Sequence, residues 1–510
     1  MTPSPGSPQR DAAPRSPGGR LEAADTGEAA RHALGPWRAA LLERLESRGG
    51  YRSWVLFAAL AGMFATSFPI TILAVSLAPI AVEFGSSETT MAWVVSGPML
   101  LSAVSFPLLG KLGDLRGHRT VFLLGFAGAT AVAALTAFSW DAPSLIAFRT
   151  LAAMLGGATQ PTAMALIFSV HPPEERVRAM GWWSMTTAAA PALGLVAGGP
   201  LVDLFGWRIV FLFQAALSAV ALALAVVVLR ETPRKRVRFD VWGSAALAVG
   251  IGGFMFAVGS LRDLAHGPER VIASAVVGLL GLVAFVAVER RVEAPLLPLE
   301  FFRSRHFTAT LLTNAFTSAA YMGSFIVAPM LLGFRGYSVT AASYLILIRT
   351  ATLTLASPVG GRLGERMGER WASVVGCALL TLGCGLVALA AMTWSLGLFV
   401  LGLVAQGAGH GLSQPSITAA IARSVEEGDL GIAAAANRLM GQGGAAFGIT
   451  VLTLAYGGDA RPEAFAFAFA TGAGLSALSV AAATFMGIQV VHPGHASPRE
   501  SDARSTSSPR

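Results

Sequence analysis

The chain contains 510 residues, of which 54% are hydrophobic and only 13% are charged, and its mean hydropathy is +0.61. Because soluble domains carry about 25% charged residues, this composition excludes a soluble globular protein and indicates a polytopic membrane protein. The net charge of +8 does not indicate a nucleic-acid partner, because the basic residues lie in short loops between apolar runs, where they orient membrane helices.

The chain begins with a polar segment. Residues 1–50 are rich in Pro, Ser, Gly and Arg and predict a disordered tail rather than a signal peptide, because no apolar stretch follows the first charges. Trp37, Leu41 and Leu45 recur every four residues, which predicts either a short amphipathic helix on the membrane surface or an extension of the first span. Residues 492–510 predict a second disordered tail.

Long apolar runs occupy the rest of the chain. A helix needs about 20 apolar residues to cross the core of a bilayer. Fourteen runs have this length, at 54–80, 91–109, 121–140, 143–169, 179–200, 208–229, 241–260, 271–288, 307–332, 339–358, 371–391, 395–420, 430–456 and 464–490. They predict an all-α polytopic membrane protein with fourteen transmembrane helices.

The basic residues orient these helices. With the N-terminus in the cytoplasm, 29 of the 37 Lys and Arg residues fall in cytoplasmic segments and five fall in outer loops. Because Lys and Arg concentrate on the cytoplasmic side of a membrane, both termini are predicted to be cytoplasmic. The expected location is the plasma membrane, as a multi-pass protein.

Two motifs occur twice at nearly the same offset. The charged loop at 110–119 returns at 361–370, with glycine, leucine, acid, glycine and arginine in matching positions. The pattern Gly-x-x-Gln-Pro at 157–161 returns at 411–415. Duplicated helical bundles form transporters with a central site between the halves. The domains predicted from this repeat are a six-helix bundle at 51–230, a linker with two inserted helices at 231–306, and a second six-helix bundle at 307–491.

Three segments resemble motifs of one membrane protein family. Residues 110–119 resemble the signature loop between helices 2 and 3 of the major facilitator superfamily. Residues 145–149, with Pro161, resemble the arginine motif of its helix 4, and 190–199 resemble the antiporter motif of its helix 5. The chain is therefore similar to the fourteen-span drug:proton antiporter branch of that superfamily, which implies the major facilitator fold.

The chain departs from that branch within each motif and in helix 1. The residues at 68–71 are Phe-Pro-Ile-Thr, where the branch usually has an aspartate. Ala152 and Ala153 replace the Gln-Gly that usually continues the arginine motif, and His118 replaces an arginine of the signature loop. In the helix 5 motif, a glycine and a proline are replaced by Ala190 and Leu195. These departures affect the usual proton-coupling and drug-binding arrangement.

The charged turns and the glycine-rich helix are the predicted conformational elements. An acid at Asp114 can cap a neighbouring helix or pair with Arg119. The resemblance implies that Asp114 latches one access state through helix 13. The alternative for Asp114 is a charged turn that only orients the protein in the membrane. The same two interpretations apply to Glu365 in the second copy of the loop. Glycines and a proline make helix 5 thin and bendable. The predicted gating residues are Gly110, Asp114, Gly117, Arg119, Gly361, Glu365, Gly368, Arg370, Pro191, Gly194, Gly198 and Gly199.

The apolar runs contain no Asp or Glu, but they contain Arg149, Arg349, Arg438 and His410. A charged residue at the membrane centre costs about 2.5–3.5 kcal/mol on insertion scales, so these side chains are expected to face a wet cavity or a partner. Arg438 lies near the inner end of its helix, where it can extend to water. The predicted residues for substrate binding or proton coupling are Arg149, Arg349, His410, Asn314, Tyr321, Gln406 and Asn437.

The predicted function is proton-coupled export of small amphipathic molecules, anionic or neutral, by alternating access. Proton-coupled uptake of an anionic solute and a non-transporting sensor or scaffold are the alternatives. The sequence has no Walker loop for ATP and no catalytic constellation, and Cys377 and Cys384 lack the spacing of a metal site. No enzyme activity, cofactor, metal or nucleic-acid partner is therefore expected. The expected partners are the lipid bilayer, a small-molecule substrate and protons, and the expected state is a monomer.

Overall fold

The computed structural model describes residues 36–234, 241–261, 268–292, 299–425 and 430–487. These residues form helices and turns, and no strand is found among them. Residues 1–35 of the predicted N-terminal tail (1–50) and all of the predicted C-terminal tail (492–510) lie outside the described residues.

The first bundle contains the six predicted spans of the N-terminal half. Two of these spans are broken into two helices each, one at Phe68–Pro69 and one at Gly157–Ala158. Proline has no amide hydrogen to donate within a helix, which favours the break before Pro69. The helices are α3 (Tyr51–Ser67), α4 (Pro69–Glu83), α5 (Glu88–Met91), α6 (Trp93–Arg116), α7 (His118–Thr136), α8 (Ala142–Gly156), α9 (Thr159–Val170), α10 (Pro173–Phe205) and α11 (Arg208–Val228).

The second bundle contains the last six spans, and an inserted helix pair precedes it. The inserted pair is α12 (Val241–Gly259) and α13 (Pro268–Glu289). The second bundle follows η2 (Leu299–Arg303) and consists of α14 (Arg305–Phe334), α15 (Val339–Met367), α16 (Glu369–Thr393), α17 (Leu396–Ala422), α18 (Leu430–Tyr456) and α19 (Pro462–Thr484).

Helix length and composition agree with the predicted spans. Thirteen segments among the described residues are long and apolar enough to cross a membrane. Most of the remaining predicted span, 91–109, lies on α6, a helix of 24 residues that packs against α8 and α18. Many large apolar side chains on the outer faces are exposed, as lipid contact requires. The chain is thus a multi-pass membrane protein, and the predicted all-α fold class is confirmed.

The repeated charged loop forms a tight turn in both bundles. Gly117 ends α6 with φ of 98°, and Gly368 ends α15 with φ of 82°. Residues with a side chain rarely adopt such positive φ values, whereas glycine adopts them at little cost. The next helix begins at the following residue in each case. The conserved spacing of the repeat therefore reflects one backbone conformation that is used twice.

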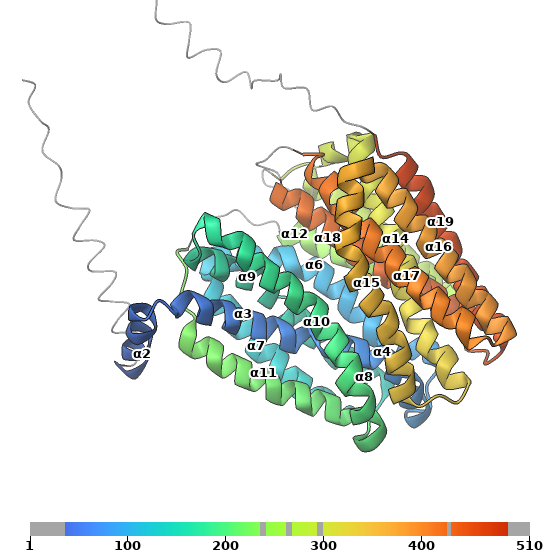
Figure 1. Cartoon of the computed structure of the whole chain (residues 1–510), viewed down its shortest axis with the longest axis horizontal. Helices are drawn as coiled ribbons and strands as arrows, with labels where there is room; N and C mark the ends of the chain where they lie inside the picture. Colours follow the sequence, from blue (N-terminus) through green and yellow to red (C-terminus); the bar gives the residue numbers. More distant parts are fainter. Residues whose placement is uncertain (1–35, 235–240, 262–267, 293–298, 426–429, 488–510) are drawn as a thin grey trace, which may run out of the picture.

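The two bundles meet at one end and lie apart at the other. Figure 1 shows the first bundle in blue and green and the second in yellow and red, in contact along α10 and α15. One cluster of buried apolar side chains joins both bundles and includes residues near the end of α4 and the start of α15. At the opposite end each bundle has its own cluster. We name the end at which the bundles meet the Asp203 end, and the opposite end the Asp114 end.

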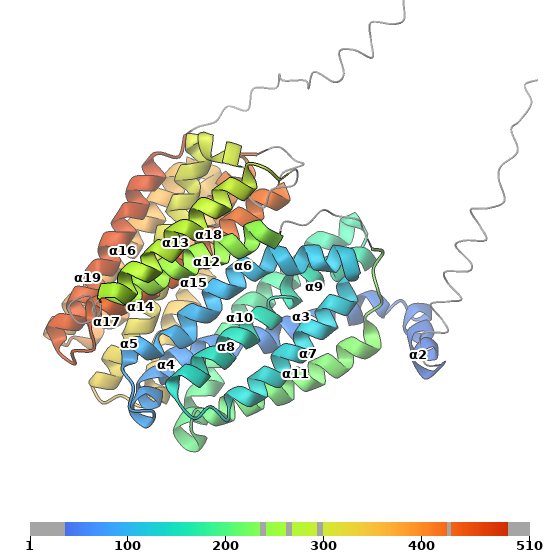
Figure 2. The same cartoon turned by 180° about the vertical axis from the view of Figure 1, so that it is seen from behind.

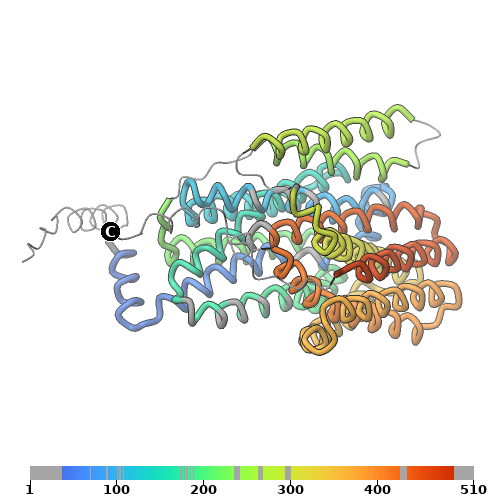
Figure 3. The backbone as a smooth tube through the Cα atoms, turned by 90° about the horizontal axis from the view of Figure 1, so that it is seen from above, coloured from blue at the N-terminus to red at the C-terminus, as the bar shows by residue number. Residues whose placement is uncertain are grey.

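The inserted helices lie outside the two bundles. Figures 2 and 3 show α12 and α13 as a pair along one side of the molecule. Only α12 has extensive contacts with the bundles, to α6 and α18. The pair itself is close-packed, because a Cβ atom on Gly253 would lie 2.6 Å from the backbone nitrogen of Gly278. Small residues at such contacts allow helix backbones to approach closely in a membrane.

The short helix α2 (Pro36–Ser47) is attached to the first bundle by a buried arginine. The Nε atom of Arg38 donates a hydrogen bond of 2.8 Å to the carbonyl oxygen of Val227, and a terminal nitrogen donates to that of Leu229. These carbonyls lie at the end of α11, where a cation is favoured by the helix dipole. Trp37 is 64% exposed and Leu42 is fully buried. The helix thus presents one apolar face to the protein and another outward.

Candidate substrate cavity and gate contacts

Two adjacent cavities lie between the bundles. The larger has a volume of about 370 Å³ and is lined mostly by α14, α17 and α18. The smaller has a volume of about 120 Å³ and is lined mostly by the first bundle. Met99 and Gln442 line both cavities, which places them next to each other. No Asp or Glu is among the described residues that line either cavity.

A network of amide side chains lines the larger cavity. The Nδ2 atom of Asn314 donates hydrogen bonds to the side-chain oxygen of Asn437, at 2.6 Å, and to its carbonyl oxygen, at 2.9 Å. The Nε2 atom of Gln414 donates to Oδ1 of Asn314 at 3.2 Å. The structure therefore brings the predicted residues Asn314 and Asn437 together, and it adds Gln414 from the second Gly-x-x-Gln-Pro motif.

Arg349, Tyr321 and His410 form a stack beside the larger cavity. The guanidinium carbon of Arg349 lies 3.6 Å from the centre of the Tyr321 ring, and the His410 ring lies 4.0 Å from that centre and nearly parallel to it. The guanidinium and the imidazole are both too close to the Tyr321 ring to lie on the same face of it. The phenol ring therefore lies between them. Arg349 is fully buried and donates to the carbonyl oxygen of Tyr321. Tyr321 and His410 line the cavity, whereas Arg349 lies behind them.

Arg149 lies at the smaller cavity, and no acidic residue is among the described residues that line this cavity. Its side chain is 5% exposed, and its guanidinium carbon lies 5.4 Å from the centre of the Phe211 ring. In the described part of the chain its guanidinium has no hydrogen bond or ion pair. Gln160, Gln214 and Ser218 line the same cavity. Gln406 is fully buried and lines neither cavity, so the structure does not group it with the other predicted binding residues.

The first charged turn has partners other than the one the sequence suggests. Asp114 lies 3.3 Å from Nε2 of His118, one turn along the chain, rather than beside Arg119. The backbone nitrogens of Arg119 and Thr120 instead donate to the carboxylate of Glu231, at 2.9 and 3.0 Å. Sequence reasoning missed Glu231. The only feature of the sequence that could have indicated its role is the position of an acidic residue just after a predicted span. Glu231 caps α7, because Gly117 provides no side chain for that purpose.

The second charged turn differs from the first in its packing. Glu365 is exposed, whereas the neighbouring Glu369 forms an ion pair of 2.9 Å with Arg423. Gly110 packs against Pro161, but Gly361 faces open space. The guanidinium carbon of Arg370 lies 5.3 Å from the centre of the Trp371 ring. In the described part of the chain, Arg370 forms no ion pair with Glu365, the partner that its position in the repeat suggests.

The glycines of α10, which is helix 5 of the predicted spans, face two different bundles. A Cβ atom on Gly194 would lie 2.5 Å from the carbonyl oxygen of Phe68, and one on Gly198 would lie 2.2 Å from Ile72, both within the first bundle. One on Gly199 would lie 2.7 Å from the hydroxyl of Ser343, in the second bundle. The carbonyl oxygen of Pro191 accepts a hydrogen bond of 2.9 Å from Thr71. Helix α10 therefore packs closely on both sides.

Among the described residues, two polar contacts join the bundles, and sequence reasoning predicted neither. At the Asp203 end, the carboxylate of Asp203 on α10 accepts hydrogen bonds from the backbone nitrogens of Val339, at 3.2 Å, and Thr340, at 2.8 Å. At the cavities, Arg438 on α18 donates to the side-chain oxygen of Gln160 on α9. The partners are 136 or more residues apart, so no local pattern marks them.

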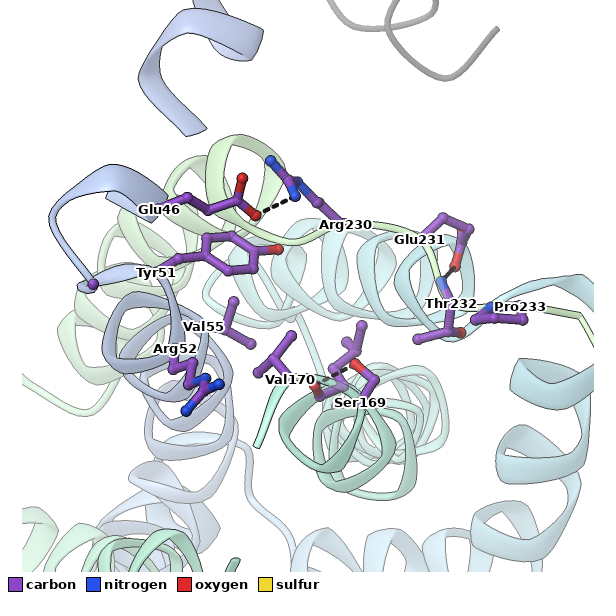
Figure 4. Close-up of a pocket in the computed structure, with 12 residues that line it drawn as sticks. Glu46, Tyr51, Arg52, Val55, Ser169, Val170, Arg230, Glu231, Thr232 and Pro233 are labelled. Carbon is purple, nitrogen blue, oxygen red and sulfur yellow. Dashed lines mark hydrogen bonds and ion pairs between the residues drawn. The ribbon is translucent and has the colours of Figure 1, made fainter. Parts of the chain in front are cut away.

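A further hollow lies away from the bundle interface. It has a volume of about 730 Å³ and lies among the end of α2, the start of α3, the end of α9 and the segment after α11 (Figure 4). Glu46 and Arg230 form an ion pair at its edge, and Tyr51 and Arg52 also line it. Because it contains none of the predicted binding residues, we place the candidate site in the two interface cavities.

Known proteins resemble this chain in sequence. The tetracenomycin C resistance and export protein of Streptomyces glaucescens is 29% identical over 332 residues, which cover 64% of this chain and 62% of that protein. The multidrug transporter protein MdtP of Bacillus subtilis is 25% identical over 410 residues, or 80% of this chain and 76% of that protein. The probable multidrug resistance protein EmrY of Escherichia coli is 28% identical over 63% of this chain and 64% of that protein.

Solved structures share the fold at lower identity. A bacterial homologue of the human lysosomal transporter Spinster, in an inward-facing and unoccupied conformation, aligns with a TM-score of 0.59 and 19% identity over 86% of this chain and 95% of that one. A peptide transporter POT in complex with sulfate aligns with a TM-score of 0.64 and 17% identity over 85% of this chain and 95% of that one.

The family model for the Major Facilitator Superfamily matches residues 57–348 and 310–509, which together include both bundles and the inserted helices. The two bundles, the repeated turns between their helices and the cavities at their interface agree with this match. This protein therefore belongs to the Major Facilitator Superfamily.

Proposed function

We propose that this protein is a drug-efflux transporter that exports small amphipathic molecules, anionic or neutral, by alternating access in exchange for protons. The relatives named above are described as export or multidrug resistance proteins, which supports the direction and the type of substrate. The single observation that carries the charge preference is the lining of the two cavities. It includes Arg149, His410 and Arg438 and no Asp or Glu among the described residues.

The positions of the bundles support alternating access. The excess of basic residues in one set of loops supports an orientation with the Asp114 end in the cytoplasm. On this orientation, the bundles are closed toward the outside by Asp203 and the shared apolar cluster. They are separate toward the cytoplasm, and the molecule is in an inward-open state. Transport then requires the Asp203 end to open and the Asp114 end to close.

The gate residues have defined roles in this cycle. In the inward-open state, Asp114 pairs with His118 within its own turn. Closure of the cytoplasmic end brings the first charged turn toward the second bundle, where Asp114 leaves His118 for the N-terminus of α18. Proton coupling falls to His410, to Asp114 or to an ionisable group of the substrate, because the spans themselves contain no Asp or Glu.

The test is transport in proteoliposomes across an imposed pH gradient, with matched anionic, neutral and cationic amphiphiles. We expect gradient-dependent flux of anionic and neutral compounds against the proton movement, and little flux of cations, because an unpaired cation in this cavity meets no carboxylate. Flux in the same direction as protons would indicate uptake by symport. A protein that moves no compound of the panel would contradict transport and favour a sensor or scaffold.

A further inference from the structure

Arg438 extends from the second bundle across the interface to the first. Its guanidinium donates a hydrogen bond to the side-chain oxygen of Gln160, and its guanidinium carbon lies 4.7 Å from the centre of the Phe106 ring. Gln160 lies on α9 and Phe106 on α6, which both belong to the first bundle. Arg438 also lines the larger cavity and is exposed there.

Among the described residues, no partner neutralises the charge of Arg438. No ion pair to its guanidinium is found in the described part of the chain, and its hydrogen-bond partner is a neutral amide. Arg349 differs in this respect, because it is fully buried behind Tyr321 and bound to a backbone carbonyl. Arg438 is therefore the arginine of the larger cavity that a solute can reach.

An amide and an aromatic ring hold an arginine more weakly than an anion does. A guanidinium binds a carboxylate or sulfonate through two parallel charge-assisted hydrogen bonds, which are about twice as strong as neutral ones. The interactions with Gln160 and Phe106 keep the guanidinium in the cavity at a small free-energy cost of release. An anionic group that enters the cavity gains the stronger interaction and displaces both.

We propose that Arg438 is the residue that selects a carboxylate or sulfonate group on the transported molecule, and that Gln160 and Phe106 hold its guanidinium while the cavity is empty. This proposal rests on the proposed function and assigns the substrate class to one side chain. Gln160 and Gln414 occupy equivalent positions in the duplicated Gly-x-x-Gln-Pro motif. Gln414 keeps its bond to Asn314 in the second bundle, while Gln160 gives up its bond to Arg438.

The exchange of partners also affects the interface. Because Gln160 belongs to the first bundle, transfer of Arg438 from Gln160 to the ligand breaks a contact between the bundles. A bound anion thus removes one interaction that joins the bundles while the cavity is empty. If this contact is absent from the other access state, anion binding favours the movement of the bundles.

The test is equilibrium binding to the purified full-length protein in nanodiscs, without a pH gradient. The probes are radiolabelled 1-naphthalenesulfonate and 1-naphthoate, neutral 1-naphthalenesulfonamide and cationic 1-naphthyltrimethylammonium. Arg438→Gln is expected to weaken binding of the two anions about tenfold or more and to change binding of the sulfonamide by about twofold or less. Arg438→Lys, which keeps the charge but loses the paired donors, is expected to lie between the wild type and Arg438→Gln.

Gln160→Ala provides a second variant that keeps the arginine. It is expected to strengthen anion binding about threefold, because the guanidinium no longer has to leave an acceptor. Arg461→Gln is the control, since Arg461 lies in an exposed loop and pairs with Asp459. The proposal is overturned if neither anion binds the wild type, if Arg438→Gln binds all probes as the wild type does, or if Gln160→Ala weakens anion binding. Because binding needs no gradient, an intact anion preference without gradient-driven flux contradicts the proposed function alone.

Discussion

At the scale of single residues, carboxylates that accept hydrogen bonds from helix N-termini recur at the ends of the spans. Glu231 caps α7, Asp203 caps α15 and Asp141 caps α8. The free amides of a helix N-terminus and the helix dipole both favour a negative charge there. Asp203 differs from the other two, because the helix that it caps belongs to the opposite bundle.

Removal of the Asp203 carboxylate should open the Asp203 end. Asp203→Ala loses both hydrogen bonds to α15, which stabilise the closed form by about 0.5–2 kcal/mol as helix caps do. Spin labels at Leu204 and Phe334, on exposed sites of the two bundles, should report a new population with a longer distance. An unchanged distance distribution would show that apolar packing alone holds this end closed. Asp459→Ala, in an exposed loop, should leave the distribution unchanged.

Asp141 predicts a pH dependence of stability. Hydrogen bonds from the Ser144 side chain and backbone lower the pKa of Asp141 below its ordinary value. A carboxylate whose pKa is lower in the folded state stabilises the protein above its unfolded pKa, and this contribution is lost as the pH falls through the folded pKa. Asp141→Ala should therefore lower the thermal unfolding midpoint at pH about 7, and the difference from wild type should shrink toward pH about 3. An equal difference at both pH values would exclude the charged cap.

At the scale of secondary-structure elements, glycine determines how closely the helices of this protein approach. The span positions and the two glycine-ended turns were predictable, because apolar length and glycine spacing are local properties of the sequence. The residues that each helix face contacts were not predictable from the sequence. The burial of Arg349 behind Tyr321 and the contact of Gly199 with the second bundle depend on helix packing. The partners of Asp203 and Arg438 lie 136 or more residues away, which leaves no local pattern to recognise.

A methyl group at Gly198 should separate α10 from α4. The added Cβ atom would lie 2.2 Å from a side-chain carbon of Ile72, and overpacking of this kind costs about 1–3 kcal/mol. Gly198→Ala should therefore lower the thermal unfolding midpoint in detergent. Gly385→Ala on α16 is the matched control, because nothing lies within 4 Å of its Cβ position. A Gly198→Ala protein as stable as the Gly385→Ala protein would mean that the contact relaxes without cost.

At the scale of the whole molecule, one arrangement accounts for the repeat, the cavities and the charge distribution. Two bundles that share two repeated motifs enclose cavities at their interface, and the basic loops determine which end faces the cytoplasm. The inserted helices add two crossings and so preserve the orientation of the second bundle relative to the first.

The orientation is testable with reporter fusions. Reporters placed after Arg238, Arg303 and Arg370 should all give cytoplasmic signals, because each position follows an even number of crossings and lies in a basic segment. A fusion in the loop after Gly458 should give an external signal and serves as the reference of opposite sign. An external signal at Arg303 together with a cytoplasmic one at Arg238 would remove one helix of the inserted pair from the membrane.

Proton movement driven by the substrate tests the central claim of proton-coupled export most directly. If protons and substrate move in opposite directions through one site, a substrate gradient must drive protons as surely as a proton gradient drives substrate. In proteoliposomes with a pH-sensitive dye inside and no initial pH difference, an outward gradient of a transported anion should acidify the lumen, and vesicles without the protein should show no change. Movement of the anion with no change in lumenal pH, or with alkalinisation, would contradict the account.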